Sequence, residues 1–209
     1  MKKLLVAALL VATPVLSQAA PNLIVNGSFE SPVIGSGGLA FLSTFPGPGL
    51  PGWFTPEVEV RNNLVGAAQD GNNFVELDSH SNSWIAQTFA TVAGQAYNLS
   101  FWYSPRAGVG SDSNGIAAFL NGEEEVTLTA NGTTHTGNVW GNYSTTFIAG
   151  AGGVTSLAFL AVGQSDSLGG SLDNVSVTAV PEPETYALLL GGLALVGFSA
   201  RRRSEKPKA

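Results

Sequence analysis

The sequence predicts an all-β protein, an antiparallel jelly-roll sandwich, and three features indicate this fold. Short runs of β-branched and aromatic residues alternate with turns rich in Gly, Asn, Ser and Pro. No window of the body keeps the 3.6-residue period that an amphipathic helix requires. Residues 96–104 alternate strictly, with Tyr97, Leu99, Phe101 and Tyr103 on one face. Many short strands of this kind are typical of a β-sandwich.

The first half of the body is expected to contain short strands separated by long turns. We expect these strands at residues 23–25, from Trp53-Phe54 onward, at 57–61, at 73–78 and at 84–90. Residues 31–51 are predicted to form a long loop rich in Gly and Pro, in which Phe41 and Phe45 point inward. Val58 and Val60 share one face of their strand, because side chains alternate along a strand.

The second half is expected to contain longer strands. These are predicted at residues 96–104, 116–120, 123–128, 140–148, 154–162 and 172–178. Asn121-Gly122 is a strong signal for a hairpin turn between two of them. Val175 and Val177 are expected to face the core from the last strand. The sequence therefore predicts nine or ten strands in one domain, with no internal repeat.

The N-terminus has the pattern of a secretory signal peptide. Lys2-Lys3 precedes an apolar stretch over residues 4–16, and Ser17-Gln18-Ala19 fits the small-x-small rule for cleavage. Cleavage after Ala20 would place a proline directly at the scissile bond, so we expect signal peptidase to cut after Ala19. Residues 1–19 are therefore excluded from the fold.

The C-terminus contains three features in order. Pro181-Glu182-Pro183 comes first, an apolar run follows over residues 186–200, and Arg201, Arg202 and Arg203 come last. A helix over these 15 apolar residues would be about 22 Å long, which is short of the roughly 30 Å hydrocarbon core. The arginines would keep the end of the chain on the cytoplasmic side. Such a segment suits brief anchoring followed by removal.

This layout resembles the PEP-CTERM sorting signal of Gram-negative bacteria, which an exosortase reads and cleaves. The resemblance covers residues 181–209 and implies cleavage near Pro183. It also implies transient association with the inner membrane through a short transmembrane helix, and delivery to the cell surface or extracellular matrix. An amphipathic core helix is the alternative, but this run is apolar on all sides.

The remaining body, residues 20–180, is acidic and contains no cysteine. Only Arg61 and Arg106 are basic there, against twelve carboxylates, which gives a net charge of about −10. This charge disfavours binding to nucleic acid or to anionic lipid. The absence of cysteine excludes disulfides, thiol catalysis and thiolate metal sites.

Four segments of the body are similar to those of a known fold family. Residues 22–30 and 172–177 resemble the first and last strands of galactose-binding-like jelly rolls, the fold of many carbohydrate-binding modules. Residues 87–89 and 99–103 are similar to those of bacterial relatives of the DUF642 cell-wall proteins. The resemblance implies a β-sandwich, often with structural Ca²⁺ and often with sugar binding.

The resemblance also implies a calcium site shared by Glu30 and Asp173, with backbone oxygens near Asn26 as helpers. Ca²⁺ takes six to eight oxygen ligands. Asp173 is expected to point inward, because it has the same parity as Val175 and Val177. A buried carboxylate is costly unless it is paired. The alternative is that backbone N–H groups at the end of the sandwich satisfy both carboxylates.

Candidate sugar-binding residues are the tryptophans and Arg106. Trp102 is predicted to lie on the face opposite Tyr97, whereas Trp53, Trp84 and Trp140 follow turns and could line a rim. Each tryptophan taken singly is more often part of a core. Arg106 either clamps a ligand hydroxyl or pairs with Asp112 and holds its own loop.

No catalytic constellation is evident in the sequence. Asp78, Ser79 and His80 are adjacent, whereas the members of a catalytic triad converge from separate segments. Glu76 and Asp78 share a strand face, but a glycosidase pair faces across a cleft. Glu123-Glu124-Glu125 is expected to be a solvated strand edge.

The sequence therefore predicts an exported, non-catalytic β-sandwich protein that binds carbohydrate, with exopolysaccharide of a biofilm as the expected partner. Two alternatives remain open: a polysaccharide-active hydrolase, and a structural matrix protein without a ligand. Converging carboxylates in a cleft would favour the hydrolase, and exposed aromatic rings on one plane would favour the sugar-binding protein.

Overall fold

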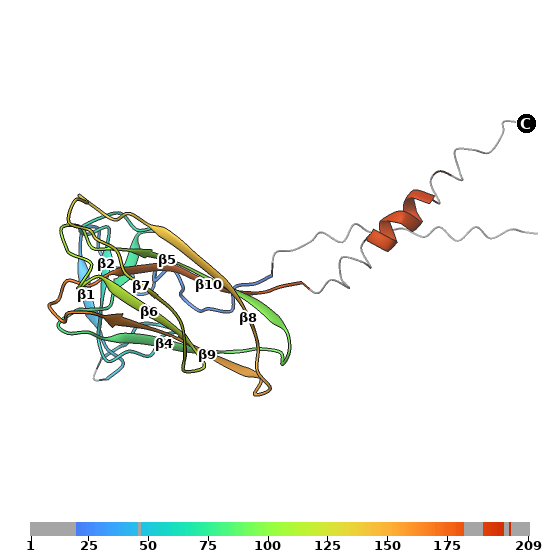
Figure 1. Cartoon of the computed structure of the whole chain (residues 1–209), viewed down its shortest axis with the longest axis horizontal. Helices are drawn as coiled ribbons and strands as arrows, with labels where there is room; N and C mark the ends of the chain where they lie inside the picture. The colour runs from blue at the N-terminus through green and yellow to red at the C-terminus, as the bar shows by residue number, and fades with distance from the viewer. Residues whose placement is uncertain (1–19, 46, 182–189, 199–200, 202–209) are drawn as a thin grey trace, which may run out of the picture. The chain divides into compact units, whose positions relative to one another are not determined.

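Two antiparallel sheets make up the body in the computed structural model, which describes residues 20–45, 47–181, 190–198 and 201. One sheet has six strands in the order β1-β2-β3-β10-β5-β8, and the other has four in the order β4-β9-β6-β7. Figure 1 shows β5 and β10 in one layer and β4 and β9 in the other. The prediction of an all-β antiparallel sandwich is confirmed.

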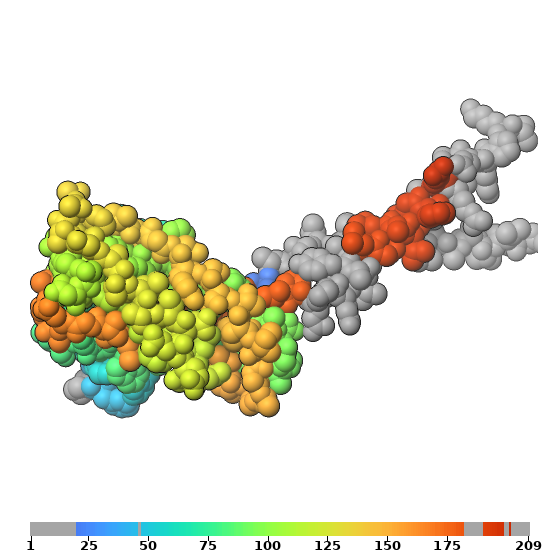
Figure 2. All heavy atoms as spheres, in the orientation of Figure 1, coloured from blue at the N-terminus to red at the C-terminus, as the bar shows by residue number. Residues whose placement is uncertain are grey.

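The strands follow one another along the body with no helix between them. The six-stranded sheet contains β1 (Leu39–Leu42), β2 (Val58–Asn62), β3 (Asn73–Glu76), β5 (Ala96–Ser104), β8 (Gly141–Ile148) and β10 (Ser171–Ala179). The four-stranded sheet contains β4 (Trp84–Ala90), β6 (Gly115–Leu120), β7 (Glu123–Leu128) and β9 (Val154–Val162). In Figure 2, the chain from β6 to β8 forms much of the surface that faces the viewer.

Most strands from β2 onward lie where the sequence predicts them. The predicted bounds of β4, β5, β7 and β9 agree with the observed ones, and all the other strands from β2 to β10 differ by a few residues at most. Asn121 and Gly122 both have positive φ, 52° and 87°, as a two-residue hairpin turn requires. Val58 and Val60 are fully buried, as expected.

The described residues between 20 and 50 differ from the prediction. The stretch expected to be one long loop contains strand β1, which pairs with β2 from Leu39↔Arg61 to Leu42↔Val58. Phe41 and Phe45 are 45% and 77% exposed, so the prediction that they point inward is wrong. Phe41 pairs with Glu59 on the outer face of the sheet. Leu42, at the end of β1, is buried in the core, and Ala40 packs against it.

Residues 23–25 are not a strand, although the sequence predicts one there. The segment is part of a turn in which Asn26 and Phe29 both have φ of 55°, a left-handed conformation that ends strand geometry. Its backbone still bonds to β10, through Leu23 N–H to the Val177 carbonyl and Val175 N–H to the Gly27 carbonyl. A Cβ atom on Gly27 would lie 2.1 Å from the Val175 oxygen, so only glycine allows this approach.

A β-bulge in β10 changes which way Asp173 points. The register with β5 shifts between Asp173 and Ser176, and Asn174 has φ of 47°. Asp173 therefore pairs with Trp102, on the outer face, whereas Val177 pairs with Leu99, on the inner face. The inward direction predicted from parity is wrong, because parity fails across a bulge. Asp173 is nevertheless fully buried, because a loop covers it.

Aromatic rings from both sheets meet in the core. Phe101 of β5 and Phe159 of β9 are fully buried, with ring centroids 4.8 Å apart and an interplanar angle of 74°. Trp53 is 4% exposed and packs on Phe159 at 6.3 Å and on Phe29 at 5.7 Å. Edge-to-face contacts of this kind stabilise a core beyond the area that they bury.

The described part of the tail contains a helix over residues 190–198. Within the described residues, none of the helices has the length and apolar character needed to cross a membrane. The predicted signal peptide, residues 1–19, lies outside the described residues. Residues Pro21–Val180 form a compact unit with its own core.

Truncating Phe159 is expected to destabilise the body strongly. Phe159→Ala removes the ring that joins Phe101 to Trp53, and losses of about 3–5 kcal/mol in the free energy of unfolding are typical of such cavities. Phe45→Ala, at a 77% exposed position, serves as the control and should change stability by less than about 0.5 kcal/mol. Urea unfolding of residues 20–181 measures both. Equal effects of the two substitutions would contradict this description of the core.

Candidate functional site

Asp173, a predicted calcium ligand, holds the loop between β2 and β3. Its Oδ2 accepts backbone hydrogen bonds from Gln69 at 2.8 Å and Asp70 at 3.0 Å, and its Oδ1 accepts one from Asn174 at 2.6 Å. Burial raises the pKa of Asp173 to about 7, although these N–H groups act in the opposite direction. The carboxylate thus sits in an environment that disfavours its charge.

Glu30, the second predicted ligand, binds the same loop a few residues further on. Its Oε1 accepts the N–H groups of Asn72 at 2.8 Å and Asn73 at 2.7 Å. The structure therefore brings Glu30 and Asp173 to one short stretch, residues 69–73, although they are far apart in sequence. Backbone N–H groups satisfy both carboxylates, as the alternative interpretation expects.

Asn26 serves the neighbouring turn. Its side-chain amide donates to the carbonyls of Ser31 at 2.7 Å and Pro51 at 3.0 Å, and its Oδ1 accepts the N–H of Ser31 at 3.0 Å. Its own carbonyl accepts the indole N–H of Trp53 at 3.1 Å. These contacts fix the segment before Glu30 against the loop that leads to β2.

The oxygen atoms near residues 69–73 are of types that can bind a calcium ion. Asn73 Oδ1 is buried and has no hydrogen-bond partner among the described residues. The backbone N–H of the same residue, Asn73, donates to Glu30. Ser28 Oγ donates at 2.6 Å to Oδ2 of Asp70, which lies in the same short stretch. Carboxylate, amide and hydroxyl oxygens therefore gather around residues 69–73, and these are the oxygen types that Ca²⁺ prefers. Among the described residues, no group of three or more acidic, His or Cys side chains forms a metal cluster.

Trp102 lies on the outer face of the six-stranded sheet, as predicted from its parity. It pairs with Asp173 on one side and with Asn142 on the other, and it is half-buried. Trp140, at the start of β8, is also half-buried. Its indole donates to the Ala67 carbonyl at 2.9 Å, and its ring packs edge-on against Phe74. The loop containing residues 67–70 therefore covers much of this face.

Trp84 lies beside an exposed phenylalanine that the sequence analysis did not select. The rings of Trp84 and Phe54 are stacked, with centroids 5.5 Å apart and an interplanar angle of 27°. Phe54 is 49% exposed, and Phe45 lies 6.2 Å beyond it. A backbone bridge between Phe54 and Ala86 extends the four-stranded sheet and fixes the pair at its edge.

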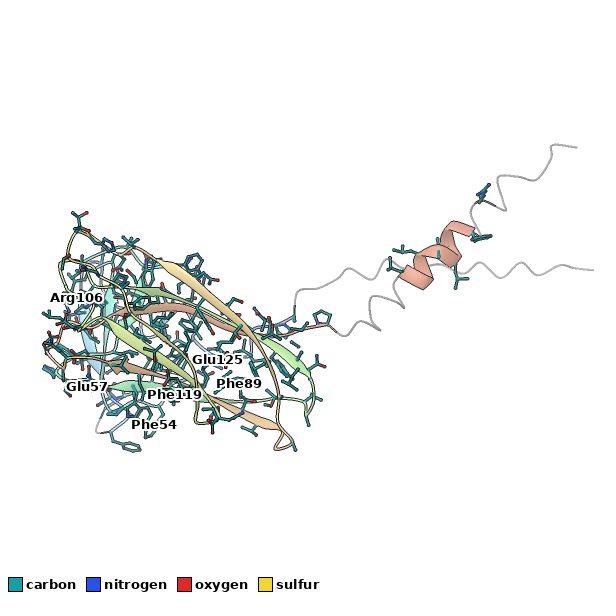
Figure 3. All side chains as sticks on the ribbon, in the orientation of Figure 1. Phe54, Glu57, Phe89, Arg106, Phe119 and Glu125 are labelled. Atoms are coloured by element: carbon teal, nitrogen blue, oxygen red, sulfur yellow. The ribbon has the colours of Figure 1, made fainter. Side chains whose placement is uncertain are left out.

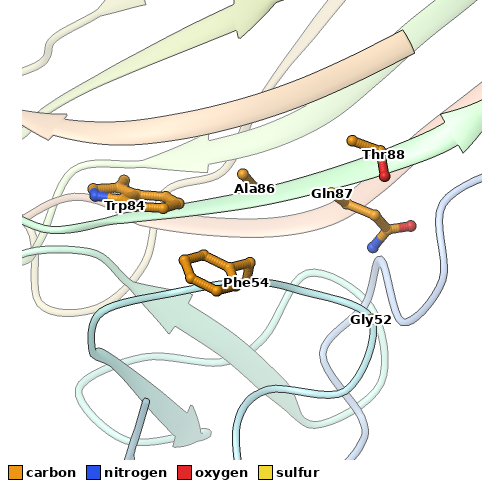
Figure 4. A pocket seen from close by; sticks show the side chains of 6 residues that line it. All are labelled: Gly52, Phe54, Trp84, Ala86, Gln87 and Thr88. Atoms are coloured by element: carbon orange, nitrogen blue, oxygen red, sulfur yellow. The ribbon is translucent and has the colours of Figure 1, made fainter. Parts of the chain in front are cut away.

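This aromatic pair lines a hollow of about 360 Å³. Figure 4 shows Phe54 facing Trp84, with Ala86 and Thr88 further along β4. Gln87 and Gly52 complete the lining, and both amide atoms of Gln87 are bound to the backbone of Val25. None of the lining residues carries a charge. One signal in the sequence could have identified Phe54, namely that it follows the buried Trp53 and so faces the other way.

Arg106 belongs to a buried ionic network instead of an open site. Its Nη1 donates to the Ser167 carbonyl at 3.0 Å and lies 3.6 Å from Glu76. Arg61 joins Glu76 and Glu59 at 3.1 and 2.7 Å. Arg106 thus secures the loop before β10, whereas Asp112, its expected partner, accepts a hydrogen bond from Gln164.

The carboxylates that converge here do not face a cleft. Glu59 is 5% exposed and Glu76 is fully buried. Glu76 Oε1 accepts the N–H groups of Asp78 and Gly169, and Asp78 Oδ2 accepts those of Asp166 and Ser167. Glu76 and Asp78, which the sequence predicts on one strand face, therefore hold backbone N–H groups in place.

His80 contacts an acidic side chain and an aromatic ring. Its Nδ1 lies 2.6 Å from Glu57, and its ring lies on that of Phe41 with centroids 4.5 Å apart. Ser79 Oγ also donates to Glu57, at 3.2 Å. Figure 3 labels Glu57 and Arg106 on the body. Asp78, the first residue of the run Asp78-Ser79-His80, accepts the backbone N–H groups of Asp166 and Ser167.

Comparison with known proteins confirms the predicted sorting signal in the tail. Residues 179–203 match the model of the PEP-CTERM protein-sorting motif. The chain therefore carries the sorting signal of an exported protein that an exosortase processes. Pro181 is exposed and Arg201 is helical, whereas Ala19, Glu182, Pro183, Arg202 and Arg203 lie outside the described residues.

The body is similar to part of a much larger protein and to several solved structures. The chain is 30% identical over 178 residues to the multifunctional-autoprocessing repeats-in-toxin of Vibrio cholerae, covering 82% of this chain but only 3% of that protein. A Stig cyclase from Fischerella sp. TAU has 18% identity and a TM-score of 0.55, over 78% of this chain and 99% of the cyclase. A carbohydrate-binding module in complex with β-1,4-galactotriose has 20% identity and a TM-score of 0.48, over 77% of this chain and all of that one. The cyclase supports the β-sandwich fold, and the chain is an exported β-sandwich protein with a PEP-CTERM signal.

The buried network is expected to make the body more stable in mild acid than at neutral pH. Burial raises the pKa of Glu76 from 4.5 to about 7, with Arg61 acting in the opposite direction. Between these pH values the folded state holds a proton that the unfolded state has lost, so stability falls as the pH rises. The loss attributable to Glu76 is up to about 3 kcal/mol.

Chemical unfolding of wild type and Glu76→Gln between pH 5 and pH 8 measures this effect. The substitution should make stability less dependent on pH, leaving the slope that Asp173 contributes, because burial also raises the pKa of Asp173 to about 7. Glu123→Gln, at an exposed glutamate of β7, is the matched control and should leave the slope unchanged. A wild-type stability that rises across this range would show that Glu76 is ionised in the folded protein.

Proposed function

We propose that the mature body is a non-catalytic carbohydrate-binding domain that works at the cell surface or in the exopolysaccharide matrix of a biofilm. The observation that carries this proposal is the stacked pair of Phe54, which is 49% exposed, and Trp84, which is half-buried, over an uncharged hollow. Burying the apolar face of a sugar ring against such rings removes apolar surface from water. The hydroxyl of Thr88 lies at the same hollow and can bond to the ring's hydroxyl groups.

The pair is built to remain in place without a ligand. Phe54 exchanges two backbone hydrogen bonds with Ala86, at 2.8 and 2.9 Å, and Gln87 holds the adjacent turn through Val25. A preformed platform loses little conformational entropy when a ligand binds. An exposed aromatic pair fixed in this way favours a binding function over a purely structural one.

The main alternative, a polysaccharide-active hydrolase, finds less support. Among the described residues, the carboxylates that come together, Glu59 and Glu76, are buried and paired with Arg61. A glycosidase needs two accessible carboxyl groups on either side of the glycosidic bond. The proposal is therefore for binding without hydrolysis.

Export supplies the context for this function. The PEP-CTERM signal gives processing by an exosortase, and we propose signal peptidase cleavage after Ala19 and cleavage near Pro183. After the first cut and before the second, the helix near the C-terminus would associate transiently with the inner membrane. The released body has two basic residues against twelve acidic ones, so it would avoid nucleic acid and anionic lipid.

Substitution of the aromatic pair tests the proposed function. Phe54→Ala and Trp84→Ala should each weaken binding to neutral polysaccharides about tenfold, because stacking on each ring contributes about 1 kcal/mol or more. Binding of residues 20–181 to laminarin, β-1,4-galactan and xylan is measured by affinity electrophoresis and calorimetry. Phe41→Ala, an equally exposed phenylalanine on the other sheet, is the control.

Three results would contradict the assignment. Absence of binding by the wild-type protein to all three polysaccharides would overturn the proposed function. Loss of binding in Trp102→Ala, with Phe54→Ala unaffected, would instead place the site on the six-stranded sheet. Release of reducing sugar during incubation would support the hydrolase.

We also propose that Ca²⁺ binds where Glu30 and Asp173 meet residues 69–73. Support comes from the unpartnered, buried Asn73 Oδ1 and from the full burial of Asp173 without a cationic partner among its described contacts. A bound cation would offset the cost of keeping that carboxylate charged, and would fasten the loop to β10. Its role would be structural.

Thermal unfolding with CaCl₂ and with EDTA tests the calcium site. Saturating Ca²⁺ should raise the melting temperature by about 5–10 °C, the shift expected for a ligand well above its Kd in a domain of this size. Glu30→Gln should abolish the shift, whereas Glu57→Gln, whose partner is His80, should retain it. Identical melting curves in calcium and EDTA would remove the metal from this account.

A further inference from the structure

A row of paired residues runs across the outer face of the four-stranded sheet. Phe54 pairs with Ala86 of β4, Ala86 with Ala158 of β9, and Ala158 with Phe119 of β6. Residues directly opposite each other in antiparallel strands have side chains on the same face. Two phenylalanines therefore stand at the ends of a row whose middle is formed by two alanines.

The dimensions of this row suit an elongated ligand. Neighbouring strands are about 4.8 Å apart, so three steps separate Phe54 from Phe119 by about 14 Å. The methyl groups of Ala86 and Ala158 are short, which leaves a trough between the larger rings. Figure 3 labels Phe119 on β6 and Phe54 beside β4. The hollow at Phe54 and Trp84 is thus one end of a longer feature.

The two sides of the trough differ in chemistry. On one side, Trp84 pairs with Leu160, which makes an apolar wall. On the other side, Thr88 pairs with Ser156, which makes a wall of hydroxyl groups. A chain of pyranose rings offers matching surfaces, because each ring has apolar faces and carries hydroxyl groups around its edge.

Charge limits which chains fit. The floor and walls of the trough contain no ionisable side chain. At the β6 end, Phe119 pairs with Glu124 of β7, which is exposed and carries a negative charge into an already acidic body. Like charges repel, so a chain of uronic acids or sulfated sugars is disfavoured. A neutral polysaccharide meets no such penalty.

This face is also open, whereas the part of the other sheet formed by β2 and β3 is covered. Ala86, Ala158 and Phe119 are each half-exposed, and Thr88 is exposed. On the six-stranded sheet, the corresponding outward residues Glu59, Arg61 and Phe74 are buried beneath loops. A long chain can therefore lie across the four-stranded sheet without displacing any part of the described body.

We infer that the outer face of the four-stranded sheet binds an extended neutral polysaccharide, which runs across the strands from the Phe54–Trp84 platform to Phe119. This inference rests on the proposed function and specifies its ligand as an internal stretch of a long chain. A chain end or a single sugar would use only the platform. Internal binding suits a protein retained in a matrix, because polymers offer many internal sites and few ends.

Calorimetry with a ladder of neutral oligosaccharides tests the inference. Affinity for laminarin or galactan oligomers should rise at least tenfold between the disaccharide and the hexasaccharide, as the chain reaches Phe119. Phe119→Ala should reduce this ratio to about one. Ala158→Phe, which fills the trough, should do the same without removing either end platform.

The matched control is Val154→Phe, a bulky substitution on the same strand and face, about 13 Å further along β9. Val154 pairs with Ala90, is 56% exposed and lies outside the trough. It should leave the length dependence intact, and circular dichroism confirms that each variant is folded. Sodium alginate, an acidic chain, should not compete.

The possible failures can be told apart. Equal affinity for short and long oligomers, with loss in Phe54→Ala, would overturn the extended trough and leave the proposed function standing. Tight binding of alginate, or an unchanged length dependence in Ala158→Phe, would also overturn the inference. Absence of binding to every neutral glycan would overturn the inference together with the proposed function.

Discussion

Four carboxylates, three of them fully buried, hold the loops of this protein, and the rest of the structure depends on them. Asp173, Glu30, Glu76 and Asp78 each accept at least two backbone N–H groups from a loop. Charge-assisted bonds of this kind are stronger than neutral ones, and removing the acceptor would leave buried donors unpaired. An exported domain of this size often relies on disulfides, but this chain has no cysteine. The carboxylates fasten loops to strands in their place.

Strand positions were largely predictable, because they depend on local alternation. Residues 84–90 and 154–162 show the two-residue period clearly, and each strand matches its predicted bounds. Strand β1 was missed because only four residues, Leu39–Leu42, form it, and their pairing with β2 is a tertiary contact. The direction of Asp173 was wrong because a bulge at Asn174 is not visible in a hydrophobic pattern.

The candidate site was predictable only in part, for a related reason. Trp84 was selected as an aromatic residue after a turn, but its partner Phe54 becomes significant only through the bridge to Ala86. Glu30 and Asp173 were paired on the strength of a resemblance, and their carboxylates bind N–H groups of one short stretch, residues 69–73. Arg106 was assigned to its own loop or to a ligand, whereas its partners are Ser167 and Glu76, which are distant in sequence. Pairings across the sandwich carry no local signal.

The buried carboxylates also explain why one face of the sandwich is free. The loops that Asp173, Glu76 and Asp78 fasten lie against the six-stranded sheet, where they bury Arg61 and Phe74. With those loops committed to one sheet, β4, β9 and β6 keep an uncovered outer face. Exposed apolar side chains on such a face favour association unless a ligand uses them. Loop anchoring on one sheet therefore leaves accessible the face of the other sheet on which we propose that the ligand binds.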